Sequence, residues 1–183
     1  MERKPTLTTI AIEKLHPHPD NPRKVLGDID ELADSIKANG ILQNLTVVPM
    51  NDDWTEFTVI IGHRRLAAAK QAGLTELPCA VVEMTEKEQL STMLTENMQR
   101  SDLTVYEEAK GCQLLLDLGD TVAEVAEKTG FSESKIRRRV KLCELDEESF
   151  KESQLRQPTL ADYERLNQIK NIDARNELLK SIG

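Results

Sequence analysis

The chain has 183 residues with a formal net charge of −8; 39% of the residues are apolar, 31% are charged and only 3% are aromatic. This composition is that of a globular protein and excludes an intrinsically disordered chain. The scarcity of aromatic side chains also argues against base stacking as the general means of holding single-stranded nucleic acid.

The cysteines and the hydropathy pattern narrow the class of protein further. Cys79, Cys112 and Cys143 are far apart and show no C-x-x-C spacing, so neither a structural zinc site nor a disulfide scaffold is expected. The sequence has no apolar run long enough for a signal peptide or a membrane span. We therefore expect a cytoplasmic protein of bacterial type with no membrane partner.

The first hundred residues mix strand and helix patterns. Residues 16–22 contain three prolines and predict an extended, turning loop rather than a helix. Two β-branched runs separated by the turn-like residues 51–53 predict a hairpin. The predicted strands are residues 8–12, 45–49, 57–61 and 79–82, and the predicted helices are residues 28–39, 64–72 and 86–98.

After residue 103 the strand signals end and only helical patterns remain. Residues 105–118 form a helical pattern that stops at Gly119, and the helical pattern of residues 146–183 is interrupted by Pro158. The predicted fold is therefore an α+β N-terminal domain, residues 1–100, followed by an all-α domain, residues 101–183.

Residues 121–142 have the pattern of a helix-turn-helix. Thr121 and Glu124 form a capping box, the first helix stops at Gly130, and Ser132 caps a second helix that is predicted to run to residue 139. Phe131 is expected to fill the elbow between the two helices. The candidate DNA-binding residues are Ser132, Ser134, Lys135, Arg137, Arg138 and Lys141.

The charge distribution supports this interpretation. Residues 121–145 contain six basic residues and four glutamates, a local charge of +2, which leaves −10 for the rest of the chain. A local basic face on an acidic body is compatible with DNA binding, because salt screens charges beyond about 8–10 Å. The alternative is a solvated basic helix in an all-helical domain.

Three further segments suggest a nucleotide site. A glycine between a strand and a helix, Gly62, lets a ligand approach the backbone, and the helix start that follows favours phosphate. Arg64 and Arg65 add charge there, and Glu96 with Asn97 offers ligands for a hydrated Mg²⁺. Taken alone, none of these segments is specific, and the arginines could equally pair with surface carboxylates.

In this order the segments resemble the ParB/sulfiredoxin superfamily, and within it the ParB proteins that segregate chromosomes, plasmids and mobile elements. Residues 21–24 (Asn-Pro-Arg-Lys) resemble the early box of that family, and residues 40–43 its Gly-Ile-x-Gln segment. Residues 62–65 (Gly-His-Arg-Arg) resemble its Gly-Glu-Arg-Arg box, and residues 96–100 its Glu-Asn-x-Gln-Arg box. With the helix-turn-helix in its place, the resemblance covers residues 7–145.

The resemblance implies a CTP-dependent DNA clamp for DNA partition. CTP and Mg²⁺ would bind the N-terminal domain and promote its self-association, as a dimer, around duplex DNA loaded at a centromere-like inverted repeat. Slow CTP hydrolysis would help to release the clamp. The implied partner is a ParA-type ATPase, and the implied location is a bacterial nucleoid, plasmid or phage. ParB proteins commonly continue into a C-terminal dimerisation domain, for which no pattern is present here, so this sequence would be either a truncated chain or a short member of the family.

The same resemblance assigns roles to residues of this sequence. Glu96 would be the catalytic residue that positions or activates the attacking water, and Glu96 and Asn97 would hold the metal. Arg100 would steady the loop or reach a phosphate. The implied nucleotide-binding residues are Gln43, Gly62, His63, Arg64, Arg65, Asn97 and Arg100.

Two departures from the family pattern bear on these roles. His63 stands where the family usually has a glutamate, which leaves CTP hydrolysis open, and Asn44 replaces the usual proline. Sulfiredoxins carry a catalytic cysteine at the phosphate turn, and no cysteine lies near Gly62, so sulfinic-acid reduction is excluded. The remaining alternatives are a ParB-like nuclease or phosphotransferase using Glu96, Asn97 and His63, and a transcriptional regulator that has lost nucleotide binding.

Overall fold

The computed structural model describes residues 4–23, 26–156 and 158–182 and divides the chain into two compact units, Met1–Met93 and Leu94–Gly183. Each unit is described by itself. The predicted domain boundary between residues 100 and 101 stays a prediction, because compact units need not coincide with domains that fold independently.

In the described part of the first unit, five strands form one mixed sheet in the order β1-β5-β3-β4-β2. The pairs β1–β5 and β3–β4 are antiparallel, whereas β3–β5 and β2–β4 are parallel. The elements are β1 (Thr6–Ala11), the 3-10 helix η1 (Ile12–Lys14), β2 (Leu15–Pro17), α1 (Asp30–Asn39), β3 (Leu45–Pro49), β4 (Phe57–Ile61), α2 (His63–Gln71), β5 (Glu76–Val81) and α3 (Glu86–Met98), whose residues from Leu94 onward belong to the second unit.

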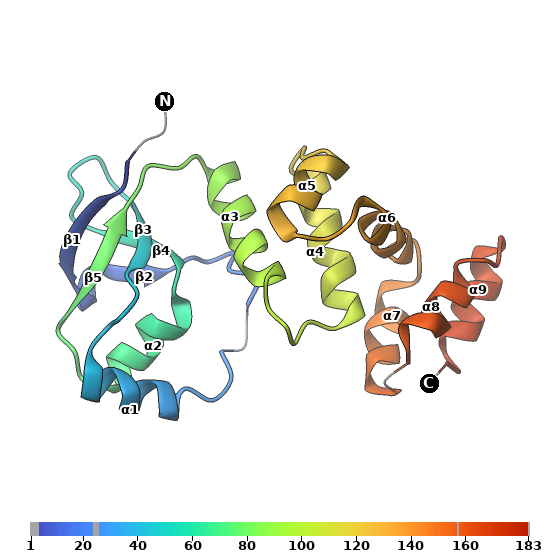
Figure 1. The fold of residues 1–183 in the computed structure, drawn as a ribbon, viewed down its shortest axis with the longest axis horizontal. Coiled ribbons are helices and arrows are strands. Elements are labelled where there is room, and N and C mark those ends of the chain that lie inside the picture. The colour runs from blue at the N-terminus through green and yellow to red at the C-terminus, as the bar shows by residue number, and fades with distance from the viewer. Residues whose placement is uncertain (1–3, 24–25, 157, 183) are drawn as a thin grey trace. The chain divides into compact units, whose positions relative to one another are not determined.

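Both faces of the sheet are covered, because alternate residues of β3 and β4 point in opposite directions. Val47 and Val59 face α1 and α2, which lie together on one side of the sheet (Figure 1). Val48 and Ile60 face the other side and pack against Met93 of α3. This two-sided burial explains why both strands are almost continuously apolar in the sequence.

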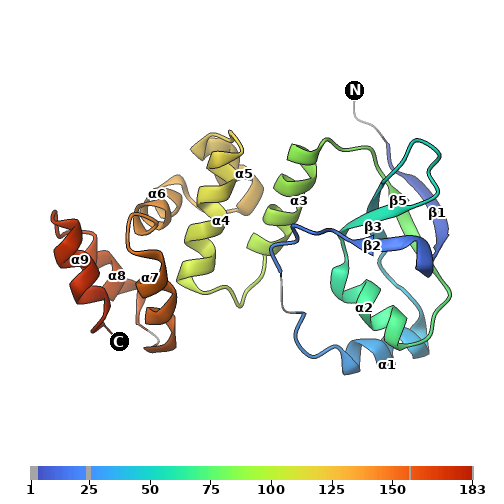
Figure 2. The same cartoon turned by 180° about the vertical axis from the view of Figure 1, so that it is seen from behind.

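The second unit is helical in its described part, and α4 is at its centre. In one core, α4 packs against α5, α6 and the last residues of α3. In a second core, α4 packs against α7, α8, α9 and the last residue of α6. The last three helices gather near the C-terminus (Figure 2). The elements are α4 (Val105–Asp117), α5 (Val122–Thr129), α6 (Glu133–Leu142), α7 (Glu147–Ser153), η2 (Gln154–Arg156), α8 (Leu160–Leu166) and α9 (Ile172–Leu179).

A close approach at Gly111 fixes the packing of α3 against α4. A Cβ atom at Gly111 would lie 2.1 Å from Sδ of Met98, which is itself 2% exposed. A side chain at this point of α4 would therefore require the buried side chain of Met98 to move.

The expected fold class is confirmed, with differences in detail. Two of the three residues of β2, His16 and Pro17, belong to the segment predicted as a loop, and they form a strand because β2 pairs in parallel with β4. β5 begins three residues before its predicted start, and α6 continues to Leu142 rather than residue 139. No helix in the described residues is long and apolar enough to cross a membrane.

Candidate nucleotide and DNA sites

The turn between β4 and α2 is built around Gly62. This residue is the N-cap of α2 and has φ +107°, a conformation that L side chains rarely adopt. A Cβ atom here would also lie 3.1 Å from Cγ of Leu45 and 3.4 Å from Cζ of Arg65. The first turn of a helix presents main-chain N–H groups that the helix does not use, so the turn has the geometry of an anion site.

The two arginines that follow connect this turn to neighbouring loops. Arg64 donates through Nη2 to the main-chain carbonyl of Asp28 at 2.7 Å. Arg65 donates through Nη1 to the carbonyl of Asn44 at 2.7 Å and also to that of Gln43. Both predicted phosphate-binding arginines therefore hold the loops beside the turn. Gln43 contacts Arg65 through its main-chain carbonyl, while its side chain is exposed.

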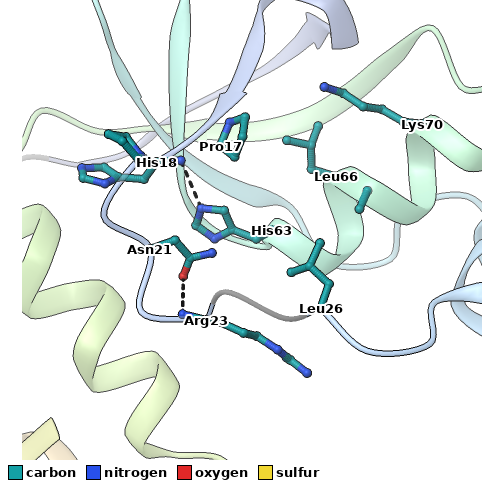
Figure 3. A pocket seen from close by; sticks show the side chains of 10 residues that line it. Pro17, His18, Asn21, Arg23, Leu26, His63, Leu66 and Lys70 are labelled. Carbon is teal, nitrogen blue, oxygen red and sulfur yellow. Dashed lines mark hydrogen bonds between the residues drawn. The ribbon is translucent and has the colours of Figure 1, made fainter. Parts of the chain in front are cut away.

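A pocket of about 290 Å³ lies beside the same turn. Its walls are mostly apolar, with a few polar groups, as is common in small-molecule sites. His63 and Lys70 approach it from α2, and Asn21 and Arg23 from the facing loop (Figure 3). The lining residues are Pro17, His18, Pro19, Asn21, Arg23, Leu26, His63, Leu66, Ala67 and Lys70. Lys24, predicted as part of the early box, lies outside the described residues.

His63 is neutral in this environment. Burial, with a smaller contribution from His18, lowers the pKa of His63 to about 4. Its Nε2 lies 3.3 Å from the main-chain N–H of His18, which donates to it (Figure 3). Nε2 is therefore the acceptor of the ring, and the proton of the neutral imidazole is on Nδ1. The residue that departs from the family pattern thus holds the loop that forms one wall of the pocket.

The predicted metal-binding and catalytic residues lie at the end of α3 and belong to the second unit. Glu96 is exposed, and Oδ1 of Asn97 accepts a hydrogen bond from Nη1 of Arg100 at 3.2 Å. Arg100 also pairs with both carboxylate oxygens of Asp102, at 3.0 and 2.7 Å, which raises the pKa of Arg100 further. The structure thus joins Asn97 to Arg100 directly.

These residues fit a magnesium site only in part. Glu96 and Asn97 are adjacent on a helix and so do not face one another, which suits a metal that keeps several waters and is shared with phosphates. Among the described residues no group of three or more His, Cys, Asp or Glu side chains is placed to hold a metal ion. Gln43 and residues 62–65 belong to the other unit, so a single site formed by both groups stays a prediction.

The predicted helix-turn-helix is formed by α5 and α6. The capping box is present, with the N–H of Glu124 donating to the Thr121 hydroxyl at 3.2 Å and the N–H of Thr121 donating to the Glu124 carboxylate at 2.7 Å. Gly130 ends α5 with φ +74°, and the Ser132 hydroxyl accepts from the N–H of Lys135 at 3.2 Å. Phe131 packs against the core that contains buried Ile136, as expected for the elbow.

Two basic residues of α6 point inward rather than to solvent. Lys135 contacts the carboxylate of Glu108 at 2.7 Å, and its Nζ lies 3.3 Å from the centre of the Phe131 ring. Arg139, which is 6% exposed at its side chain, contacts the other oxygen of Glu108 at 2.6 Å. A role for Lys135 in DNA binding stays a prediction, and its ammonium group already contacts Glu108 in a partly buried pair.

Sequence reasoning missed the pair formed by Arg139 and Glu108. The available signal was spacing, because Lys135 and Arg139 are four residues apart and therefore share a helix face beside buried Ile136. The partner on α4 could not be inferred from the sequence, since it lies 27 residues before Lys135.

The other candidate DNA-binding residues are exposed on α6 or at its start. Ser132, Ser134, Arg137, Arg138 and Lys141 all have exposed side chains. Arg137 pairs with Glu133 at 2.8 Å one turn earlier. Arg138 and Lys141 contact residues at the C-terminal end of α8. The helix therefore presents a continuous polar and basic surface opposite its core face.

Comparison with known proteins identifies the family. The ParB N-terminal domain family model matches residues 1–98, more than half of the chain, so the chain belongs to this family. It is a homologue of chromosome-partitioning proteins: it is 39% identical to the chromosome-partitioning protein Spo0J of Thermus thermophilus over 143 residues, 77% of this chain and 52% of that protein. It is also 39% identical to a probable chromosome-partitioning protein ParB of Xylella fastidiosa over 142 residues, 76% of this chain and 45% of that one.

A solved structure covers nearly the whole chain. The C-terminally truncated chromosome-partitioning protein ParB from Caulobacter crescentus, complexed to the centromeric parS site, matches with a TM-score of 0.72 and 27% identity over 94% of this chain and 98% of that one. The same protein complexed with CTP-gamma-S matches with a TM-score of 0.49, a score too low to establish a shared arrangement of the chain. The present chain spans about half the length of the curated relatives that it matches.

Proposed function

We propose that this chain is the nucleotide- and DNA-binding part of a DNA-partition protein, which binds a centromere-like inverted repeat through α6 and uses CTP to control that binding. The observation that carries the proposal is the α5–α6 pair, a capped helix-turn-helix whose second helix exposes Arg137, Arg138 and Lys141. The match to a ParB structure bound to parS supports the same conclusion.

The DNA-binding part follows from the shape and charge of the second helix. A recognition helix enters the major groove with its N-terminal residues toward the base edges and its later basic residues toward the phosphates. Ser134 is exposed in the first turn of α6, and Arg138 and Lys141 follow one and two turns later. We assign base contacts to the first turn and phosphate contacts to these later residues.

The nucleotide-binding part follows from the turn at Gly62 and the pocket beside it. The N-terminal turn of α2 would bind phosphate oxygens, and a guanidinium with five N–H donors such as that of Arg64 can add a phosphate contact to its bond with Asp28. The apolar pocket has room for part of a nucleotide beside the phosphates. The preference for CTP rests on the family resemblance alone.

When bound, Mg²⁺ would neutralise charge on the phosphates, with Glu96 and Asn97 as its protein ligands. His63 would not take part in metal binding as a glutamate would, because a neutral imidazole brings no negative charge and its Nε2 is used by His18. We therefore propose CTP binding at this turn with slow hydrolysis or none. Self-association on binding DNA and nucleotide, and a ParA-type ATPase partner, belong to the same proposal.

The test of DNA binding is fluorescence anisotropy with the parS duplex of the Caulobacter relative and a scrambled duplex. Replacing one phosphate-contacting residue, as in Arg138→Ala, should weaken binding about tenfold and reduce the salt slope by about one. The control is Arg165→Ala on α8, which removes the same charge from an exposed i,i+3 pair with Asp162. Equal affinity for wild type and Arg138→Ala at all salt concentrations would contradict the assignment of α6.

A further inference from the structure

All the basic residues of α6 already contact an acceptor within the protein, and these contacts are of two kinds. The inward kind is the contact of Lys135 and Arg139 with Glu108; the side chains of Lys135, Arg139 and Glu108 are 28%, 6% and 15% exposed. The outward kind involves Arg137, Arg138 and Lys141. A DNA phosphate approaching α6 meets only the outward kind, so these contacts determine how much positive charge is available to it.

Two of the outward contacts end on α8. Arg138 lies 3.1 Å from the carboxylate of Glu164, and Nζ of Lys141 donates to the main-chain carbonyl of Asn167 at 3.0 Å. Asn167 is the C-cap of α8, where the helix presents carbonyl groups and a partial negative charge. The C-terminal end of α8 therefore places one full negative charge and a negative helix end beside the basic surface of α6.

The Arg138–Glu164 pair is open to replacement by another anion. The two side chains are 53% and 39% exposed, and ion pairs with this exposure are weak in water. Arg139 differs, since it is 6% exposed and would be left as a buried, unpaired charge without Glu108. A phosphate can thus displace Glu164 from Arg138 while the buried pair continues to hold α6 in place.

We propose that Glu164 limits the affinity of this protein for duplex DNA by competing with DNA phosphates for Arg138. After displacement its carboxylate stays within screening distance, about 8–10 Å, of the same phosphate and repels it. Both effects weaken the sequence-independent phosphate contribution to binding and leave contacts from the first turn of α6 unchanged. Glu164 therefore lowers the affinity for specific and scrambled duplexes alike and leaves the difference between them unchanged. This inference rests on the proposed function.

The test is salt-dependent binding of the scrambled duplex by wild type and Glu164→Gln. Between about 50 and 200 mM salt the variant should bind about three- to tenfold more tightly, with a slope of log K against log salt that is steeper by about one. The matched control is Glu177→Gln, which removes the same charge from an exposed pair with Lys180 on the neighbouring helix α9. The control should bind as wild type does.

A double-mutant cycle separates local competition from a general change in charge. In the Arg138→Ala background, Glu164→Gln should give a clearly smaller gain, because Arg138, for which Glu164 and the phosphate compete, is gone and only the repulsion of the phosphate remains. An equal gain with and without Arg138, or an equal gain in Glu177→Gln, would overturn the proposal, as would no gain in Glu164→Gln while wild type binds duplex DNA. If wild type binds no duplex at any salt concentration, the proposed function fails together with this inference. Matching melting temperatures verify that the variants are folded.

Discussion

The main-chain N–H of His18 donates a hydrogen bond to Nε2 of His63 at 3.3 Å, which joins the proline-containing loop to the first residue of α2. The bond requires an unprotonated Nε2, in agreement with the lowering of the pKa of His63 to about 4 by burial and by His18. Protonation of His63 would remove the acceptor and place a charge in a partly buried site. The wall of the pocket therefore depends on a neutral histidine.

This dependence predicts a loss of stability in mild acid. The pKa of His63 in the folded protein is about 4, against an ordinary value of 6.5, so the unfolded chain takes up the proton first as the pH falls. The stabilisation is complete above pH 6.5 and is lost between pH 6.5 and pH 4. Allowing for solvent screening, the loss should be about 1–2 kcal/mol by pH 5. Urea unfolding at pH 7.5 and 5 measures it, and His63→Gln should show a correspondingly smaller change. The same change in both proteins would contradict this role of His63.

Gly62 and Gly73 form a matched pair for testing the phosphate turn. Both have positive φ, +107° and +78°, but a Cβ atom at Gly62 meets Leu45 at 3.1 Å whereas one at Gly73 meets nothing within 4 Å. Gly73→Ala should therefore cost only backbone strain, about 1 kcal/mol. Gly62→Ala should cost about 2–4 kcal/mol, because its φ lies further from the left-handed region open to L residues and the close contact with Leu45 is added. Chemical denaturation compares them, and equal losses would show that the turn tolerates a side chain.

The contact between Gly111 and Met98 should appear as coupling between two mutations. Gly111→Ala places a methyl group 2.1 Å from Sδ of Met98, so we expect a loss of about 1–3 kcal/mol despite the better helix propensity of alanine. In the Met98→Ala background the same change should cost less, since the obstructing atoms are gone. Additive losses in the double mutant would show that α3 and α4 do not depend on this contact.

Glu108 should be far more important for stability than Glu133. Glu108→Gln leaves Lys135 and the buried Arg139 without a carboxylate, which should cost about 2–4 kcal/mol. Glu133→Gln breaks only the exposed i,i+4 pair with Arg137 and should change the stability by at most about 0.5 kcal/mol. Thermal unfolding of both variants distinguishes them, and similar melting temperatures would mean that the buried pair contributes little.

The predicted elements were correct where local chemistry decides the structure. The capping box at Thr121 and Glu124 and the stop at Gly130 depend on neighbours within a few residues, so the helix-turn-helix could be predicted from the sequence. β2 could not, because three residues that include a proline gain strand structure only from β4, more than forty residues later.

The candidate sites also divide into features fixed by neighbouring residues in the sequence and features fixed by distant partners. The geometry of the turn at Gly62 arises because this single residue separates the end of β4 from the start of α2, a spacing that is visible in the sequence. The partners of Arg64, Arg65, Lys135 and Arg138 are carbonyl or carboxylate oxygens between 21 and 36 residues away in sequence, and nothing in the local pattern specifies them. Residue types thus indicated the chemistry, while the tertiary contacts determined which groups are engaged inside the protein.

Nucleotide binding at the Gly62 turn is the part of the account on which the proposed control of DNA binding by CTP depends, and isothermal titration calorimetry tests it most directly. We predict that wild type binds CTP in the presence of Mg²⁺ and binds ATP, GTP and UTP much more weakly. Gly62→Ala should lose CTP binding while Gly73→Ala, which also places a side chain at a positive φ but away from the turn, retains it. No heat of binding from any of the four nucleotides with a folded wild-type sample would contradict the account and leave a DNA-binding module without a nucleotide control.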